Sequence, residues 1–487
     1  MRVLSRLATV AGIIIAVIAT IWLVRAFESR NLPELRLWHQ ASLDNEFNVD
    51  DYPDGLSLEA YFELEDRLMQ ELETKVVAQV PRANRKLFSR YSETSPINPR
   101  NLPRNWNRSF QLSVDEPRGG ILLLHGASDS PYSMRAVAEV FHGLGFHVLA
   151  LRLPGHGTVP AGLKAVTAED WVAITRLGVR WLREQLPGSV PLYLGGYSTG
   201  ATLAVDYTLD AMIEPRLEVP SRLFLFSPAI GISQFAAFAH WDVALSNIPY
   251  FEKFAWGNIS PEYDPFKYNS FAKNAGDIVY TLTVSVGKKI LKLLSDGQWR
   301  RLPPTLTFHS LIDSTVSTTS LVTALYGRLE SPGHELVLFD LNRDSETIEF
   351  VKPAQLKYLQ SEGDRENLPY RFTLVTNRDA NSKDVVARTR CAPKGCWSSE
   401  DLNLSWPQNV YSLSHVAIPF APTDPMYGSD STTAYVENMM LGALQPRGER
   451  QVLLVPVEQL TRLRYNPFFS YLRQRVIEFC TDCQGGP

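Results

Sequence analysis

The chain has 487 residues, of which 45% are hydrophobic and 21% are charged, and its formal net charge is −4. This composition is typical of a folded protein with one large core or two ordinary ones, and it excludes intrinsic disorder. The sequence contains neither a basic stripe nor an aromatic RNA-binding pattern, so nucleic acid is not expected as a partner.

The N-terminus opens with an apolar run. Residues 7–24 are 18 residues without a charge, and as a helix they would extend about 27 Å, close to the hydrocarbon thickness of a bilayer. A cleaved signal peptide is the alternative. We expect an uncleaved membrane anchor over residues 1–30, because no small-x-small site follows the run and Trp22, Arg25 and Arg30 are typical of a membrane interface.

Flanking charges bear on the orientation of this anchor. Arg2, Arg6 and the amino terminus lie before it, whereas Arg25 and Arg30 follow it and are partly offset by Glu28. The balance favours a cytoplasmic N-terminus, so the body of the protein is expected on the non-cytoplasmic, periplasmic side.

The four cysteines form two local pairs, Cys391 with Cys396 and Cys480 with Cys483. Disulfides are the natural expectation for an exported body, with a connectivity that the sequence leaves open. A zinc site would need four thiolates to converge from distant segments, with no histidine cluster nearby. We therefore expect no bound metal.

Residues 31–108 are polar and rich in proline, with one helical pattern over 56–77. We expect a stalk and a docking helix here. From residue 109 onwards short apolar runs alternate with helical patterns, one of which starts with the capping pair Thr167 and Asp170. The expected strands are 109–114, 120–124, 146–151, 191–197, 222–226, 304–311 and 334–341. Continuous apolar strands between helices predict a parallel sheet covered on both faces, with functional loops at the carboxyl ends of the strands.

Two insertions interrupt the alternation within the expected domain 109–487. Residues 229–301 are rich in aromatic side chains and lie between two strands, which predicts a lid over an apolar acyl pocket. Residues 342–408 are polar, with one strand-like stretch at 371–376. The chain then returns through 410–415 to a loop, and the last helix is expected within 457–479.

The central motif is Gly196-Tyr197-Ser198-Thr199-Gly200, which follows an apolar strand and precedes a helical segment. In that context Ser198 would sit on a strained turn, with its hydroxyl exposed above the end of the sheet. Side chains at Gly196 and Gly200 would collide with the neighbouring strand and helix. Ser198 is therefore the candidate nucleophile.

A serine hydroxyl needs a base, and the base needs a carboxylate that orients it. Asp313 follows a buried strand and His415 lies on a later loop, in the chain order expected for this type of nucleophile. Asp340 is the alternative carboxylate.

The other histidines are weaker candidates for the base. His334 precedes its strand, His309 lies inside a strand, and His125 is expected to brace the His-Gly turn.

An oxyanion also needs donors, and two backbone amides suffice. Thr199 begins the helix after the nucleophile, and Ala127 follows a glycine turn that brings its amide back towards Ser198. These two amides are the expected oxyanion hole. The residues that bind the rest of the substrate stay open.

Several motifs occur together: Leu-His-Gly-Ala at 124–127, Leu-Pro-Gly-His-Gly-Thr at 153–158, Gly-Tyr-Ser-Thr-Gly at 196–200, and Ser414-His415 followed by Asp-Pro-Met-Tyr-Gly at 424–428. In combination they resemble the α/β-hydrolase family, and within it the branch of monoglyceride lipases, lysophospholipases and carboxylesterases that is grouped with serine aminopeptidases. The resemblance covers roughly residues 110–330 and 405–480. It implies an α/β-hydrolase fold with a mostly parallel sheet, a triad of Ser198, Asp313 and His415, a lid, and no metal or organic cofactor.

We expect a membrane-anchored serine hydrolase that cleaves carboxylic esters, with an acylglycerol, a lysophospholipid or a short-chain ester as substrate. An aminopeptidase of the same branch is one alternative, for which Asp242, Glu252 and Glu262 would be the amine-recognising acids. A non-catalytic binding protein on the same fold is the other. The oligomeric state is left open.

Overall fold

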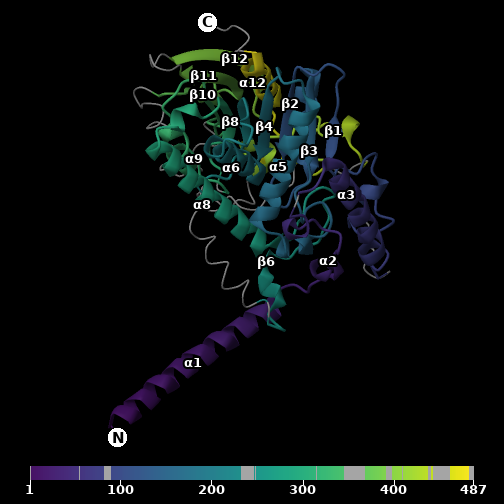
Figure 1. The fold of residues 1–487 in the computed structure, drawn as a ribbon, viewed down its shortest axis with the longest axis vertical. Coiled ribbons are helices and arrows are strands. Elements are labelled where there is room, and N and C mark those ends of the chain that lie inside the picture. Colours follow the sequence, from purple (N-terminus) through teal and green to yellow (C-terminus); the bar gives the residue numbers. More distant parts are fainter. Residues whose placement is uncertain are drawn as a thin grey trace.

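The computed structural model describes residues 2–53, 55–81, 89–231, 246, 248–313, 315–344, 368–390, 397–408, 410–436, 440–442 and 461–481. Its centre is a ten-stranded sheet in the order β1-β3-β2-β4-β5-β8-β9-β10-β11-β12 (Figure 1). The strands are β1 Phe110–Leu112, β2 Gly119–Leu124, β3 Phe146–Leu151, β4 Leu192–Tyr197, β5 Arg222–Phe226, β8 Thr305–Ser310, β9 Glu335–Phe339, β10 Arg371–Asn377, β11 Asp384–Arg390 and β12 Trp397–Ser405. From β3 to β10 neighbouring strands are parallel, whereas β1, β11 and β12 pair antiparallel.

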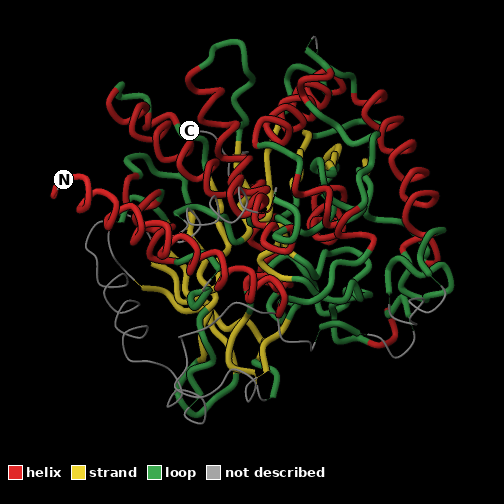
Figure 2. Tube along the Cα trace, turned by 90° about the horizontal axis from the view of Figure 1, so that it is seen from below, coloured by secondary structure: helices red, strands yellow, loops and turns green. Residues whose placement is uncertain are grey.

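Helices cover both faces of this sheet, as Figure 2 shows from below. Alternate side chains of β2 point to opposite faces: Leu122 and Leu124 join one core, and Ile121 and Leu123 the other. The first core packs against α3 (Leu58–Leu72), α5 (Ala168–Gln185), α6 (Thr199–Ile213), α8 (Lys273–Ser295) and α9 (Thr318–Ala324), and the second against α4 (Arg135–Gly143) and α12 (Phe469–Thr481). Two buried faces explain why a strand such as β2 is apolar at successive positions.

The helix start expected at Thr167 is confirmed, because Thr167 and Asp170 form a reciprocal capping box at α5. The helix after β8 is short: α9 ends at Ala324, and the 3₁₀ turn Tyr326–Arg328 follows it.

The described part of the polar insertion 342–408 extends the sheet, and the strand expected at 371–376 is confirmed as β10. Strand β10 pairs with β9 in parallel, and β11 and β12 add two antiparallel strands at that edge. The side chains of β12 are mostly exposed, so this edge strand carries polar residues and lacks the apolar alternation that marks a strand in sequence. After it, β13 (Val410–Leu413) pairs with β14 (Thr461–Leu463) in a separate small sheet.

The described part of the aromatic insertion, residues 248–301, is called the cap below. It contains a two-stranded sheet of β6 (Trp256–Asn258) and β7 (Phe271–Ala272), followed by α8. Helix α8 packs beside α6, where Lys289 pairs with Asp206 at 2.8 Å. Phe235, Phe238 and Trp241, which the lid prediction includes, lie outside the described residues.

The segment before the sheet is integrated into the body. Helix α3 begins at the N-cap Ser57, and its Tyr61 and Leu64 belong to the same core as Leu122. Tyr61 also donates a hydrogen bond of 2.8 Å to the carbonyl of Arg152. Helix α3 (Leu58–Leu72), which lies within the docking helix predicted over 56–77, is thus packed on the main body.

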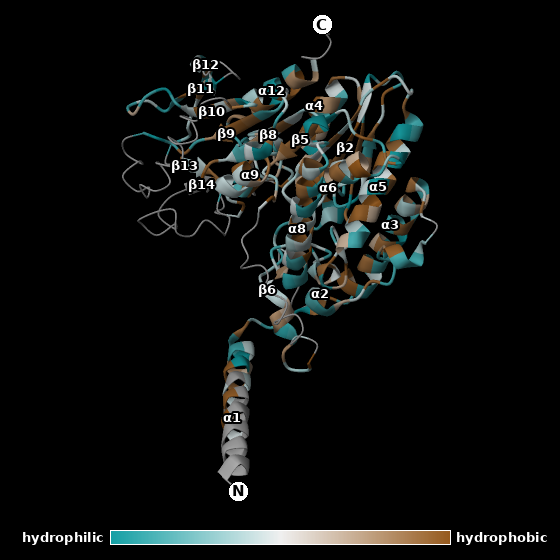
Figure 3. Ribbon diagram, turned by 60° about the vertical axis from the view of Figure 1, so that its left-hand side comes forward, coloured by the Kyte–Doolittle hydropathy of each residue, from teal (hydrophilic) through white to brown (hydrophobic). Residues whose placement is uncertain are grey.

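The first helix, α1 (Arg2–Asn31), leaves the body as a single rod (Figures 1 and 3). Its last turns contact the cap, since the Trp22 and Phe251 rings lie 5.2 Å apart and Ser29 donates to the carbonyl of Tyr250. Several side chains of the expected anchor 7–24 lie outside the described residues. Across the part of the chain that is described, none of the helices combines the length and the apolar character that a membrane crossing requires.

Candidate active site

Ser198 lies on the sharp turn between β4 and α6, close to the centre of the parallel sheet. Its backbone has φ 52° and ψ −115°, in the left-handed half of conformational space that a non-glycine residue rarely adopts. The turn is held by hydrogen bonds from the Ser198 amide to the Phe226 carbonyl and from the Ala229 amide to the Ser198 carbonyl. The strained turn expected from the motif is therefore present.

The flanking glycines allow this turn to pack. A Cβ at Gly196 would lie 2.3 Å from the backbone of Gly200, and one at Gly200 would lie 2.1 Å from the carbonyl oxygen of Leu124. No real Cβ approaches backbone so closely, so helix α6 can begin against β2 only because both positions lack a side chain.

His415 lies between Ser198 and Asp313. Its Nε2 is 3.0 Å from Ser198 Oγ, and its Nδ1 is 2.5 Å from Asp313 Oδ2. The carboxylate thus holds the Nδ1 proton and leaves Nε2 as the acceptor for the serine hydroxyl. The three residues expected from chain order are brought together, although 115 and 102 positions separate them along the chain.

The surroundings of Asp313 keep it ionised. Burial opposes its charge, but the charge of the His415 ring and its hydrogen bond outweigh burial and hold the Asp313 pKa below its usual value. Its second oxygen accepts the amides of Thr315 and Val316 at 2.8 and 3.0 Å. A fully satisfied carboxylate is rigid and suited to orienting the histidine.

The alternative carboxylate, Asp340, is used elsewhere. It pairs with Arg343 and accepts the hydroxyl of Thr376 at 2.6 Å. This leaves Asp313 as the carboxylate bonded to His415.

The discounted histidines occupy buried structural positions. His125 bonds the carbonyl of Gly126 through Nδ1 and accepts the amide of Leu153 at Nε2, so it braces the loop as expected. His309 lies behind Asp313, with its Nε2 3.9 Å from Oδ2, and burial lowers its pKa. Burial likewise lowers the pKa of His334 to about 4. All three are neutral at neutral pH.

The expected oxyanion amides lie at the start of α6 and in the loop after β2. Within the described residues, neither the amide of Ala127 nor that of Thr199 has a hydrogen-bond acceptor. Ser128, next to Ala127, has φ 62°, a second non-glycine residue in the left-handed region. Unpaired backbone amides on turns with strained residues, such as Ser128 and Ser198, are suited to binding a developing oxyanion.

Sequence reasoning missed the cap residues that touch this loop. Lys267 Nζ lies 3.0 Å from Asp129 Oδ2, and the amide of Tyr268 donates to the carbonyl of Ser128 at 2.7 Å. More than 130 residues separate the two segments, and no motif links them, so no signal along the chain could have paired them.

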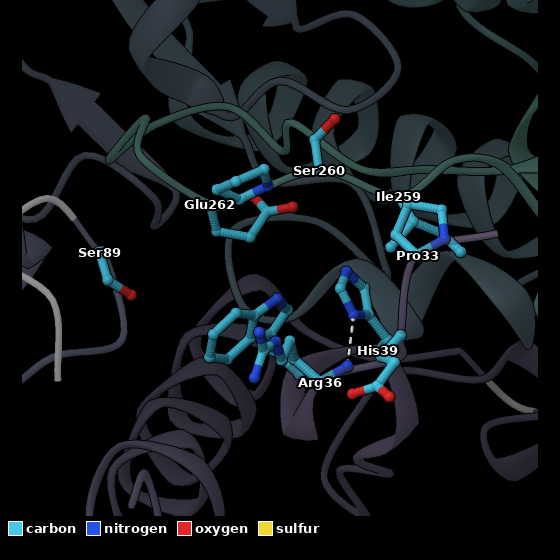
Figure 4. Close-up of a pocket in the computed structure, with 10 residues that line it drawn as sticks. Pro33, Arg36, His39, Ser89, Ile259, Ser260 and Glu262 are labelled. Atoms are coloured by element: carbon cyan, nitrogen blue, oxygen red, sulfur yellow. Dashed lines mark hydrogen bonds between the residues drawn. The ribbon is translucent and has the colours of Figure 1, made fainter. Parts of the chain in front are cut away.

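A separate cavity of about 190 Å³ lies between residues 33–39 and the cap (Figure 4). Glu262 lines it, and burial raises the pKa of this carboxyl to about 7. Both Glu262 oxygens accept backbone amides, from Asn269 and Ser270. The lining includes none of the triad residues, and Glu262 therefore organises the cap instead of facing Ser198.

Cys480 is a free thiol whose pKa burial raises to about 12. Cys391, Cys396 and Cys483, on which the disulfide and zinc hypotheses depended, lie outside the described residues, as does Asp242. Within the described ranges no three metal-binding side chains converge.

Residues 121–344 match the model of the alpha/beta hydrolase family. A thermostable monoacylglycerol lipase of Bacillus sp. (strain H-257) is 37% identical over 86 residues, which cover 18% of this chain and 33% of the lipase. The phospholipase YtpA of Bacillus subtilis (strain 168) is 24% identical over 120 residues, covering 24% of this chain and 44% of that protein. The chain thus matches between a third and a half of the length of these relatives.

Among solved structures, a chain of the metagenome-derived lipolytic enzymes LipS and LipT is 24% identical, with a TM-score of 0.37, and the match covers 53% of this chain and 99% of that one. The superposition is loose. The fold therefore rests on the strand order of this protein and on the match to the family model.

Proposed function

The chain belongs to the α/β-hydrolase family, and from this premise we propose that it is a serine hydrolase that cleaves carboxylic esters through an acyl-enzyme. The observation that carries the proposal is the hydrogen-bonded series from Ser198 Oγ through His415 to Asp313, at 3.0 and 2.5 Å. It lies beyond the carboxyl ends of parallel strands, where sites of open α/β sheets form.

Each residue has a defined role in the reaction. His415 Nε2 takes the proton of Ser198 while the serine oxygen attacks the acyl carbon, and Asp313 stabilises the resulting imidazolium. The amides of Ala127 and Thr199 bind the oxyanion, and His415 then donates its proton to the departing alcohol. Water activated by the same histidine releases the acid and restores the serine.

We propose an acylglycerol, a lysophospholipid or a short-chain ester as substrate. The relatives named as a monoacylglycerol lipase and a phospholipase support this class. The composition of the cap supports an acyl chain as well, since its buried aromatic residues include Phe254, Trp256 and Phe266.

Helix α1 is proposed to anchor the enzyme in a membrane. In support, residues 7–24 carry no charge, and Ile13, Val17 and Leu23 expose 59%, 52% and 73% of their area. Exposed apolar side chains along a projecting helix favour a lipid environment. The flanking arginines favour a catalytic body on the periplasmic side.

An aminopeptidase activity has less support. Of the acids considered for amine recognition, Glu262 is engaged by two backbone amides. A non-catalytic role would leave the series Ser198–His415–Asp313 without a purpose. Comparing the turnover of esters of graded chain length with that of aminoacyl amides distinguishes the two activities. An esterase prefers the esters, and an aminopeptidase prefers the amides.

The test is Ser198→Ala in the full chain in detergent micelles. We expect loss of fluorophosphonate labelling and a fall of at least about 10⁴-fold in p-nitrophenyl butyrate turnover. Ser295→Ala, an exposed serine at the end of α8, is the control and should keep both. Turnover that persists in Ser198→Ala refutes the assignment.

A further inference from the structure

We infer that the cap assembles the oxyanion hole: Lys267, paired with Asp129, is a positioning residue that holds the loop carrying the Ala127 amide. This inference rests on the proposed function, and it assigns a role in the same site to a segment outside the triad and its loops. The segment responsible is residues 264–268 of the cap, called the latch here.

The loop after β2 needs an external restraint. Ser128 has φ 62°, a conformation that is strained for a non-glycine residue and persists only where its surroundings hold it. The Ala127 amide that precedes it is unpaired within the described residues. Without contacts on the far side, this loop would relax and carry the amide away from Ser198.

Two contacts from the latch supply the restraint. The amide of Tyr268 donates to the Ser128 carbonyl at 2.7 Å. One residue earlier, Lys267 Nζ pairs with Asp129 Oδ2 at 3.0 Å, with the two side chains 22% and 6% exposed. The latch therefore grips the loop at the two positions that directly follow Ala127.

The latch is itself rigid. Asp264 Oδ1 accepts the amides of Phe266 and Lys267, each at 3.1 Å, and the hydroxyl of Tyr427 at 2.6 Å. The Phe266 ring stacks on Tyr132 with centroids 4.1 Å apart. Because hydrogen bonds and a stacked ring pair hold the latch in place, its contacts with the loop restrain the position of the loop.

Tyr268 extends the same latch to a second loop. Its hydroxyl accepts the amide of Thr158 at 2.8 Å and donates to the carbonyl of Gly155 at 3.1 Å. One cap residue thus joins the turn at 126–129 to the turn at 153–158. The position of the Ala127 amide therefore depends on the position of the cap.

Asp129 also explains why the loop needs a cation. The carboxyl is buried, and burial raises its pKa while Lys267 lowers it. The other charges that act on it are Asp264 and His415. Lys267 offsets the negative charge of the buried Asp129 carboxylate, and the ion pair stabilises the loop in the conformation described here.

The test is Lys267→Met in the full chain in detergent micelles, assayed on p-nitrophenyl butyrate. We expect kcat to fall about 10- to 100-fold with KM changed less than about threefold, because a misplaced oxyanion donor acts on the transition state and not on ground-state binding. Lys267→Arg, which keeps the charge, should recover most of kcat.

The matched control is Lys289→Met. Lys289 is 20% exposed and pairs with Asp206 at 2.8 Å, so it is a cap-to-core ion pair of the same kind that does not touch the loop. Its loss should leave kcat within about twofold. If unfolding temperatures show that Lys267→Met is destabilised, Asp129→Asn/Lys267→Met removes the unpaired buried charge and should retain the low kcat.

The outcomes separate this inference from the proposed function. Loss of turnover in Ser198→Ala together with a normal kcat in Lys267→Met and in the double variant overturns the latch and leaves the hydrolase intact. A defect confined to KM, or an equal defect in Lys289→Met, also overturns it. Persistent turnover in Ser198→Ala overturns the proposed function itself.

Discussion

Two buried charges lie just beyond the carboxyl ends of parallel strands, Arg152 after β3 and Asp313 after β8. The Arg152 guanidinium bonds Glu46 and Glu65 and donates to the His156 carbonyl, so the charge is enclosed by its own partners. Asp313 instead bonds His415, which leads to the half-buried hydroxyl of Ser198.

This difference separates a structural charge from a functional one. Around Arg152 the bonds end on Glu65 and the His156 carbonyl, which are buried, and on Glu46, whose side chain is 16% exposed. Burial lowers the arginine pKa, but the charges of Glu46 and Glu65 outweigh burial and raise it. In the triad the last residue, Ser198, is partly exposed. A buried ion therefore becomes chemically useful when its hydrogen-bond series ends at an accessible reactive atom.

The largest effect expected from this comparison is that of Asp313→Asn. The amide cannot hold the Nδ1 proton of His415 in the same way, so the wrong tautomer is favoured and kcat should fall about 10⁴-fold, about 5.5 kcal/mol in the barrier. Steady-state ester turnover measures it. Asp340→Asn, which alters the alternative carboxylate, should leave kcat within a few-fold. A larger loss of kcat in Asp340→Asn than in Asp313→Asn would show that Asp313 is not the carboxylate of the triad.

Next in size is Arg152→Met. It leaves Glu46 and Glu65 without their cation in the interior, and the free energy of unfolding should fall by about 3–5 kcal/mol. Chemical denaturation of the full chain measures this loss. The active fraction, titrated with a fluorophosphonate, should keep a near-normal kcat, whereas a specific loss of kcat would place Arg152 in the catalytic machinery.

Glu262→Gln should give a smaller effect that depends on pH. Burial raises the Glu262 pKa from 4.5 to about 7, so between these values the folded protein holds more protons than the unfolded chain and its stability falls as the pH rises. The full loss, reached above pH 7, is on the order of 3 kcal/mol.

Glutamine does not titrate and should remove this part of the pH dependence. Unfolding temperatures of the two proteins at pH 5 and pH 8 measure it. The gap between wild type and variant should shift in favour of Glu262→Gln at the higher pH, and an unchanged gap would contradict the prediction.

Much of the fold could be predicted because the strands of the parallel sheet are apolar on both faces and alternate with capped helices. The sheet extension could not. Strand β12 is exposed, from Trp397 onwards, and its residues resemble a polar loop. Pairing with β11, and not apolar patterning, makes this segment a strand.

The nucleophile turn and the order of its partners could be predicted along the chain, because the constraints at Gly196, Ser198 and Gly200 are local to one turn. Which carboxylate reaches His415, and which cap residues contact the loop at Ala127, depends on the packing of distant segments. Contacts such as that of Lys267 with Asp129 join segments that are distant along the chain. Their positions depend on how the cap packs against the loops after β2 and β3, and no local pattern encodes that packing.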